Sequence, residues 1–136
     1  MTATTYSAFV NSLEALVVSG VTRRLSSSSP QSLNSVDLPT QWVAAPSGNE
    51  SAITSGAEGG WSSLKADLII AYEAVGQDTG PANFVATVTM LDSVTTALRG
   101  ATAICLGPLR WDVKVAIVSV AGNTYWAIIA SVEGSG

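Results

Sequence analysis

The stretch VAIVSVAGNTYWAIIASV, residues 115–132, decides the fold because it is long, apolar and free of charge. A membrane-spanning helix needs about twenty predominantly apolar residues, and this stretch barely reaches that length. Gly122-Asn123 stands at its centre, and Gly-Asn between two β-branched runs is typical of a two-residue hairpin turn. We therefore predict that 111–121 and 124–133 form a β-hairpin and that the chain does not enter a membrane.

A hairpin with Ala121 opposite Thr124 has two faces, because successive side chains of a strand alternate. The first face is a clean apolar core made of Val113, Val115, Ile117, Ser119, Trp126, Ile128, Ala130 and Val132. The second is apolar near the turn, with Ala116, Val118, Val120, Tyr125, Ala127 and Ile129, and charged at the open end, with Asp112, Lys114 and Glu133. An apolar patch of this kind needs a cover, which is either the connector 21–38 or another subunit.

Periodicity predicts the remaining elements. An apolar stripe from Tyr6 to Val17 predicts a helix, with Thr4 or Thr5 as its N-cap and Gly20 after its end. Strands are predicted at 40–45 and 61–75, paired with each other, and a second helix at 83–100 with Pro81 near its first turn. In the second strand, Leu64, Ala66, Leu68, Ile70 and Tyr72 share one face, opposite Lys65, Asp67, Ile69, Ala71 and Glu73. The stripe of the second helix is Phe84, Val88, Leu91, Val94 or Thr95, and Leu98.

These elements predict one α+β domain over 1–136, in the order α-β-β-α-β-β. We expect a mostly antiparallel four-stranded sheet with both helices on one face. VTRRL (21–25) is expected to run extended, before a Ser-rich connector at 26–35. The segment 46–60 is rich in glycine and has no apolar period, so it is predicted to be a long flexible loop between the first two strands.

The composition favours association and disfavours nucleic-acid binding. Charged residues make up 12% of the 136 residues, about half the roughly 25% usual in globular domains, and a weakly charged surface favours association. The formal net charge is −4, whereas affinity for polyanions comes from clustered Lys and Arg. The single cysteine, Cys105, excludes an intrachain disulfide.

The sequence predicts no catalytic, metal-binding or cofactor-binding residue. There is no histidine, Cys105 has no evident base, and the carboxylates are scattered without a metal-ligand spacing. The glycine-rich GAEGG (56–60) precedes a strand rather than a helix, which argues against a phosphate loop. The four tryptophans are predicted to be core or interface anchors. The chain is therefore predicted not to be an enzyme.

The element order, together with LPTQWVAAP (38–46), NFVATVTMLDSVTTALRG (83–100) and GNTYWAIIASVEG (122–134), resembles the tail-terminator (tail-completion) proteins of long-tailed bacteriophages. Members of that family are small α/β proteins that form a hexameric ring on the end of the tail tube. The ring ends tube polymerisation and offers the surface that joins the head connector. The Ser-rich connector 26–35 departs from the family's pattern.

The resemblance implies a virion protein of the tail or neck, present in the host cytoplasm during assembly. Its partners would be further copies of itself in a homohexameric ring, the tail-tube protein and the head-tail connector. DNA would pass through the ring without being specifically bound. The residues predicted to contact partners are Glu50, Ile53, Glu58, Trp61, Asp112, Lys114, Val118, Val120, Tyr125, Ile129 and Glu133.

Three alternatives stay open from the sequence alone. Two are structural phage proteins: a tail-tube subunit, which would polymerise, and a component of the head-tail neck. The third is a small oligomeric ligand-binding domain or enzyme.

Overall fold

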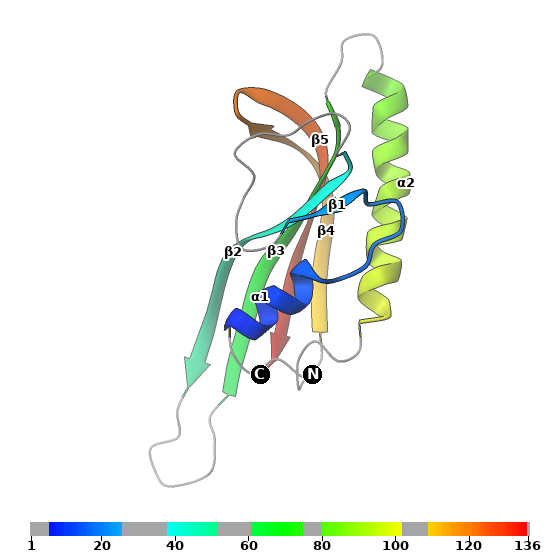
Figure 1. Cartoon of the computed structure of the whole chain (residues 1–136). Coiled ribbons are helices and arrows are strands. Elements are labelled where there is room, and N and C mark those ends of the chain that lie inside the picture. Colours follow the sequence, from blue (N-terminus) through cyan, green and yellow to red (C-terminus); the bar gives the residue numbers. More distant parts are fainter. Residues whose placement is uncertain (1–5, 26–37, 52–60, 75–79, 102–108, 136) are drawn as a thin grey trace, which may run out of the picture.

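The computed structural model describes residues 6–25, 38–51, 61–74, 80–101 and 109–135, which form one sheet and two helices (Figure 1). In chain order the elements are α1 (Tyr6–Glu14), β1 (Arg23–Arg24), β2 (Thr40–Ser51), β3 (Trp61–Ala74), α2 (Gly80–Arg99), β4 (Leu109–Val120) and β5 (Asn123–Ser135). Within the described part, neither helix is long and apolar enough to cross a membrane.

The sheet has five strands in the order β1-β2-β3-β5-β4. β1 runs parallel to β2, whereas the other neighbouring pairs are antiparallel. The predicted α+β class, with a four-stranded antiparallel sheet and the order α-β-β-α-β-β, is therefore wrong. The structure is mostly β, with 54% of the described residues in strands, and its sheet is mixed.

The strand missing from the prediction is β1, within the segment 21–25 that we expected only to be extended. Backbone bonds attach it to β2: the Arg23 amide donates to the Pro39 carbonyl and the Leu25 amide to the Gln41 carbonyl. β1 consists of two exposed arginines, so it shows no alternation of apolar and polar residues. That alternation is the sequence pattern from which a strand is predicted.

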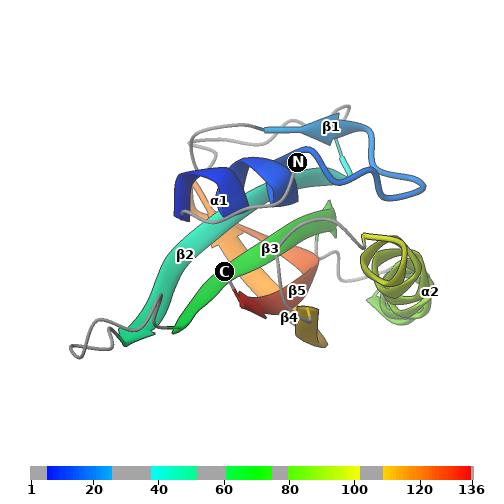
Figure 2. The same ribbon diagram turned by 90° about the horizontal axis from the view of Figure 1, so that it is seen from below.

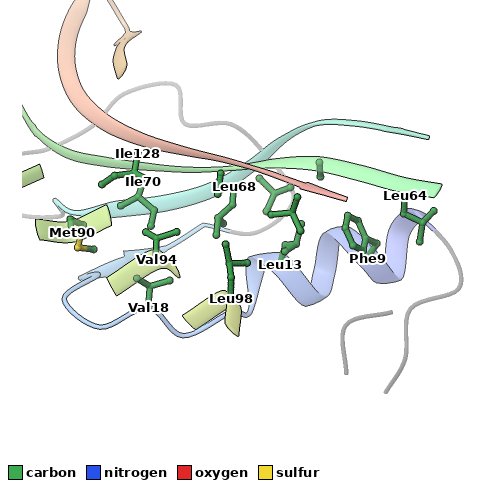
Figure 3. Packing of buried hydrophobic residues seen from close by; sticks show 14 residues of the cluster. Phe9, Leu13, Val18, Leu64, Leu68, Ile70, Met90, Val94, Leu98 and Ile128 are labelled. Carbon is green, nitrogen blue, oxygen red and sulfur yellow. The ribbon is translucent and has the colours of Figure 1, made fainter. Parts of the chain in front are cut away.

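Both helices pack on one face of the sheet, where the main core lies (Figures 2 and 3). Phe9 and Leu13 of α1, with Val94 and Leu98 of α2, are almost fully buried against the sheet. The sheet side of this core comprises Val43, Leu64, Ala66, Leu68, Ile70, Ile128, Ala130 and Val132. The predicted core face of 61–75 and its antiparallel pairing with 40–45 are confirmed.

The strands of the β4–β5 hairpin pair in a register that differs by two residues from the predicted one. Val120 pairs with Asn123, and Ala121-Gly122 forms the turn, with φ values of 53° and 82°. Two successive residues of positive φ are the requirement of a type I′ turn, which favours Gly at the second position. Because the register shift is even, every side chain keeps its predicted face.

β2 continues through the segment predicted to begin the long loop. Residues 46–51 are strand and pair with β3 as far as Ser51 opposite Trp61, so the loop prediction is wrong there. A β-bulge between Ala44 and Ser47 accommodates Pro46, which cannot donate a ladder hydrogen bond. The rest of the predicted loop, 52–60, lies outside the described residues, as does the connector 26–35.

The helix boundaries also differ from the predicted stripes. α1 ends at Glu14, so Val17 is 73% exposed whereas Val18 is buried. In α2, Thr87 and Met90 are buried and Val88 is 39% exposed, so the helix is rotated relative to the predicted stripe. The predicted N-caps of α1, Thr4 and Thr5, lie outside the described residues. Gly20 was predicted to follow the end of this helix; it has a positive φ of 90°, but it lies six residues beyond Glu14, where α1 ends.

Candidate protein interface

The sheet face opposite the helices, called the open face below, has an apolar end and a polar end. At the apolar end, Trp42, Ala71, Val120 and Tyr125 form a second buried cluster. Leu25 and Leu38, the described ends of the connector 21–38, pack against this cluster. Leu25 and Leu38 of the same chain therefore cover part of the apolar patch on the second face of the hairpin. This contact explains why Val120 and Tyr125 are buried.

The polar end of the open face is a groove of about 640 Å³ that crosses four strands. It is lined by Ala45, Ser47, Lys65, Ala66, Asp67, Arg110, Trp111, Asp112, Ser131, Val132 and Glu133. The bulge in β2 contributes to this lining, because the extra residue shifts the alternation and brings Ser47 opposite Lys65.

Strand register arranges the polar side chains of the groove in two rows across the sheet. The first row is Ser47, Lys65, Glu133 and Arg110, which are consecutive cross-strand partners. The second row is Asp67, Ser131 and Asp112. The first row alternates in charge and the second is acidic, so the groove presents a fixed pattern of both signs on a rigid sheet.

Glu133 is the centre of the first row. Its Oε1 accepts a hydrogen bond from Ser63 Oγ at 2.7 Å, and its Oε2 lies 3.8 Å from Lys65 Nζ. The Ser63 hydrogen bond is the largest cause of a lowered pKa of the Glu133 carboxyl. Desolvation opposes it, and the charges of Lys65 and Arg110 lower the pKa further by smaller amounts.

The residues of the second row, and Lys114 beside it on β4, have no oppositely charged cross-strand partner. Ser131 Oγ donates a 3.0 Å hydrogen bond to Asp67 Oδ1. Asp112 lies opposite Ser131, and Lys114 lies opposite Ile129, so these two exposed charges of β4, unlike Arg110, have uncharged cross-strand partners. Lys65 and Lys114 are the only lysines of the sequence, and both lie on the open face.

The groove carries the chemistry of a charged recognition surface. Its side chains supply carboxylates, cations and hydroxyls. Among the described residues, no group of three Asp, Glu or Cys side chains is placed to hold a metal ion. Paired charges fixed across a sheet can match the charges of another protein surface and set its orientation.

The structure brings together some of the predicted contact residues. Asp112 and Glu133 line the groove, and Lys114 and Ile129 form the adjoining cross-strand pair. Val118, Val120 and Tyr125 belong to the apolar end. Glu50 and Trp61 lie near the end of the β2–β3 pair, opposite Ser62 and Ser51 respectively. Ile53 and Glu58 lie outside the described residues.

Sequence reasoning missed Ser63, Lys65, Asp67, Arg110 and Ser131 as site residues. The alternation of 61–75 placed Lys65 and Asp67 on the outward face, which was the available signal. Predicting that these two residues lie beside the hairpin would have required the β3–β5 register, in which Lys65 lies opposite Glu133. That pairing joins segments far apart in the chain and has no local sequence signature.

The chain matches no protein-family model and no curated protein sequence. The groove and its two rows of polar residues are therefore the basis for assigning a function.

Proposed function

We propose that this protein is a structural assembly subunit that binds protein partners through the open face. The observation that carries the proposal is the groove: two ordered rows of charged and hydroxyl side chains on four strands of one sheet. In the specific form that we propose, the subunits form a ring on the end of a phage tail tube. The ring ends tube polymerisation and joins the head connector.

The groove supports protein binding because its polar groups are already oriented. Glu133 is held by Ser63 and Lys65, and Asp67 by Ser131. A preorganised polar surface loses little conformational entropy when a partner binds. The low charge content of the chain points the same way, because it leaves few groups to keep separate copies apart.

The phage assignment rests on the resemblance of 38–46, 83–100 and 122–134 to tail terminators. An acidic chain suits a ring through which DNA passes, since a basic lumen would retain the phosphates. The hexamer, the tail-tube protein and the connector as partners are part of this proposal.

A ligand-binding domain is the second candidate, and the size of the groove favours it. A volume of about 640 Å³ falls within the roughly 300–1,000 Å³ of small-molecule pockets. Such pockets are mostly apolar and enclosing, whereas this groove is lined with charges on a sheet surface. We therefore rank protein binding first.

The test uses the tail-tube protein of the phage that encodes this chain. Electron microscopy should show closed rings at tube ends, and tube growth should stop when the chain is added. The variant Asp67→Lys/Asp112→Lys should abolish this activity, because it reverses the acidic row. Asp92→Lys, on the exposed side of α2, is the matched control and should retain it. Filaments of the chain alone would identify a tube subunit, and normal tube capping by the double variant would refute the groove as the contact.

A further inference from the structure

The outer strand β4 has an open edge. It is the last strand of the sheet, with β5 on one side, and no described strand pairs with its other side. Figure 2 shows α2 on the helix-covered face rather than across this edge. Of the 12 residues in β4, Val120 alone is buried. An edge of this kind presents unpaired backbone donors and acceptors to another strand.

The two edges of the sheet are unequal. β1, at the opposite edge, has 2 residues, whereas β4 has 12. Short edge strands resist pairing with other chains, and long edge strands rich in β-branched residues promote it. The β4 sequence LRWDVKVAIVSV contains no proline, so nothing in its backbone chemistry prevents a further strand from pairing along its length.

We propose that β4 pairs antiparallel with β4 of a second copy of this chain, about a two-fold axis at Val113. Antiparallel pairing about Val113 places Asp112 of each copy opposite Lys114 of the other. These are the two exposed β4 charges whose partners on β5 are uncharged. Opposite charges that face each other across antiparallel strands stabilise the pair, so the dimer contains two such rungs.

The same register also matches the apolar side of β4. It places Trp111 opposite Val115 and Leu109 opposite Ile117 of the second copy. Ile117 is 55% exposed, in contrast to the partly buried Leu109. The pairing therefore covers the most exposed apolar side chain of the strand with an apolar partner, while Arg110 faces Ala116.

A register centred on Trp111 is the competing one. It would pair Arg110 with Asp112, but Arg110 already lies opposite Glu133 within the chain. Its ladder would end with Leu109 opposite Val113, so Lys114 and Ile117 would lie beyond the described start of the partner strand. The register centred on Val113 satisfies both charges and covers Ile117.

This dimer is a contact separate from the proposed ring, although Asp112 belongs both to the groove and to the dimer contact. It joins two five-stranded sheets into one continuous sheet, with the open faces of both copies on the same side. The groove of one copy adjoins that of the other at the Asp112–Lys114 rungs. Lys65, on β3, lies away from this contact, so occupation of the groove and pairing of β4 can be measured separately.

Charge exchange tests the register in the purified full-length chain, with mass and dissociation constant measured by sedimentation. The wild type should be a dimer. Asp112→Lys and Lys114→Asp should each weaken it by about tenfold or more, because each variant opposes like charges in two rungs. The exchange Asp112→Lys/Lys114→Asp should restore the dimer, and Asp92→Lys should leave it unchanged. A monomeric wild type, or an exchange that fails to restore a folded dimer, overturns the proposal.

A cysteine at the axis gives an independent readout. In a Cys105→Ser background, Val113→Cys should form an intermolecular disulfide under mild oxidation, because directly opposed residues of antiparallel strands have Cα atoms about 4.5–5.5 Å apart. Ala116→Cys is the matched control, because the two copies of this residue would lie about 20 Å apart at about 3.3 Å per residue. Equal cross-linking at both positions, or cross-linking at Ala116 alone, contradicts the register.

Discussion

The Gln41 side chain on β2 holds the end of α1 through the Leu16 backbone. Gln41 Nε2 donates a 2.9 Å hydrogen bond to the Leu16 carbonyl and a longer one, of 3.4 Å, to the Leu13 carbonyl. Carbonyls at a helix C-terminus have no partner within the helix. A buried side chain from the sheet therefore fixes the point at which α1 stops and the chain turns toward β1.

Gln41→Ala should lower the free energy of unfolding by about 1–3 kcal/mol, because it removes the side-chain donor of the partly buried Leu16 carbonyl. The Leu13 carbonyl keeps the Leu16 amide as a donor. Chemical denaturation measures the change. Thr22→Ala is the control, since the Thr22 hydroxyl donates to the Leu38 carbonyl at an exposed position, and it should cost less than about 0.5 kcal/mol. Equal losses for the two variants would show that Gln41 has no special role.

Gly48→Ala should destabilise the fold by about 1–3 kcal/mol through overpacking. A Cβ at Gly48 would meet the Ser63 backbone carbonyl and would lie 2.6 Å from the Tyr6 ring. The carbonyl belongs to the neighbouring strand and cannot rotate away. Gly100→Ala, whose Cβ would have ordinary contacts of 3.6 and 3.7 Å, should be nearly neutral. Thermal unfolding of both variants distinguishes steric conflict from a general effect of replacing glycine.

Ala121→Asn should stabilise the β4–β5 hairpin by about 0.5–1 kcal/mol. Ala121 has a φ of 53° in the left-handed region, which is costly for alanine and better tolerated by asparagine. The substitution creates Asn-Gly, the favoured pair of a type I′ turn. Denaturant unfolding is the measurement. A loss of stability would indicate that the turn has a different geometry.

Ser63→Ala should raise the pKa of the Glu133 carboxyl toward its ordinary value, because it removes the largest cause of the lowered pKa. Carbonyl-carbon NMR titration measures this pKa directly. A carboxyl whose pKa is lowered by folding stabilises the protein above its unfolded pKa, and this stability is lost as the pH falls through the folded pKa. Glu133→Gln should therefore be less stable than wild type at pH 7 and equally stable below the folded pKa. A difference that persists at low pH would point to lost packing instead.

The sequence predicted best where a period of two or a turn signal was present. Alternation in 61–75 identified the buried side chains from Leu64 to Ile70, and the parity of the hairpin survived a wrong turn position. It failed where long-range backbone pairing overrides local signals. Pro46 looked like the end of a strand but lies at a bulge, and Arg23 and Arg24 form a strand through bonds to β2 alone. The groove was predicted in part, through Asp112 and Glu133. Its other charged and hydroxyl residues come from all four strands, and only the long-range register brings them together.

Lysine acylation of the assembled particle tests the central claim most directly, since Lys65 and Lys114 are the only lysines and both lie on the open face. The Lys65 side chain is 50% exposed in the single chain, so its labelling rate reports whether the groove is occupied. The rate at each lysine is measured by mass spectrometry in the isolated chain and in the chain bound to the tail tubes that we propose as its partner. If the groove is the contact with a protein partner, Lys65 should be labelled several-fold more slowly in the particle. An unchanged Lys65 rate in particles that contain the chain would contradict the claim, whatever happens at Lys114.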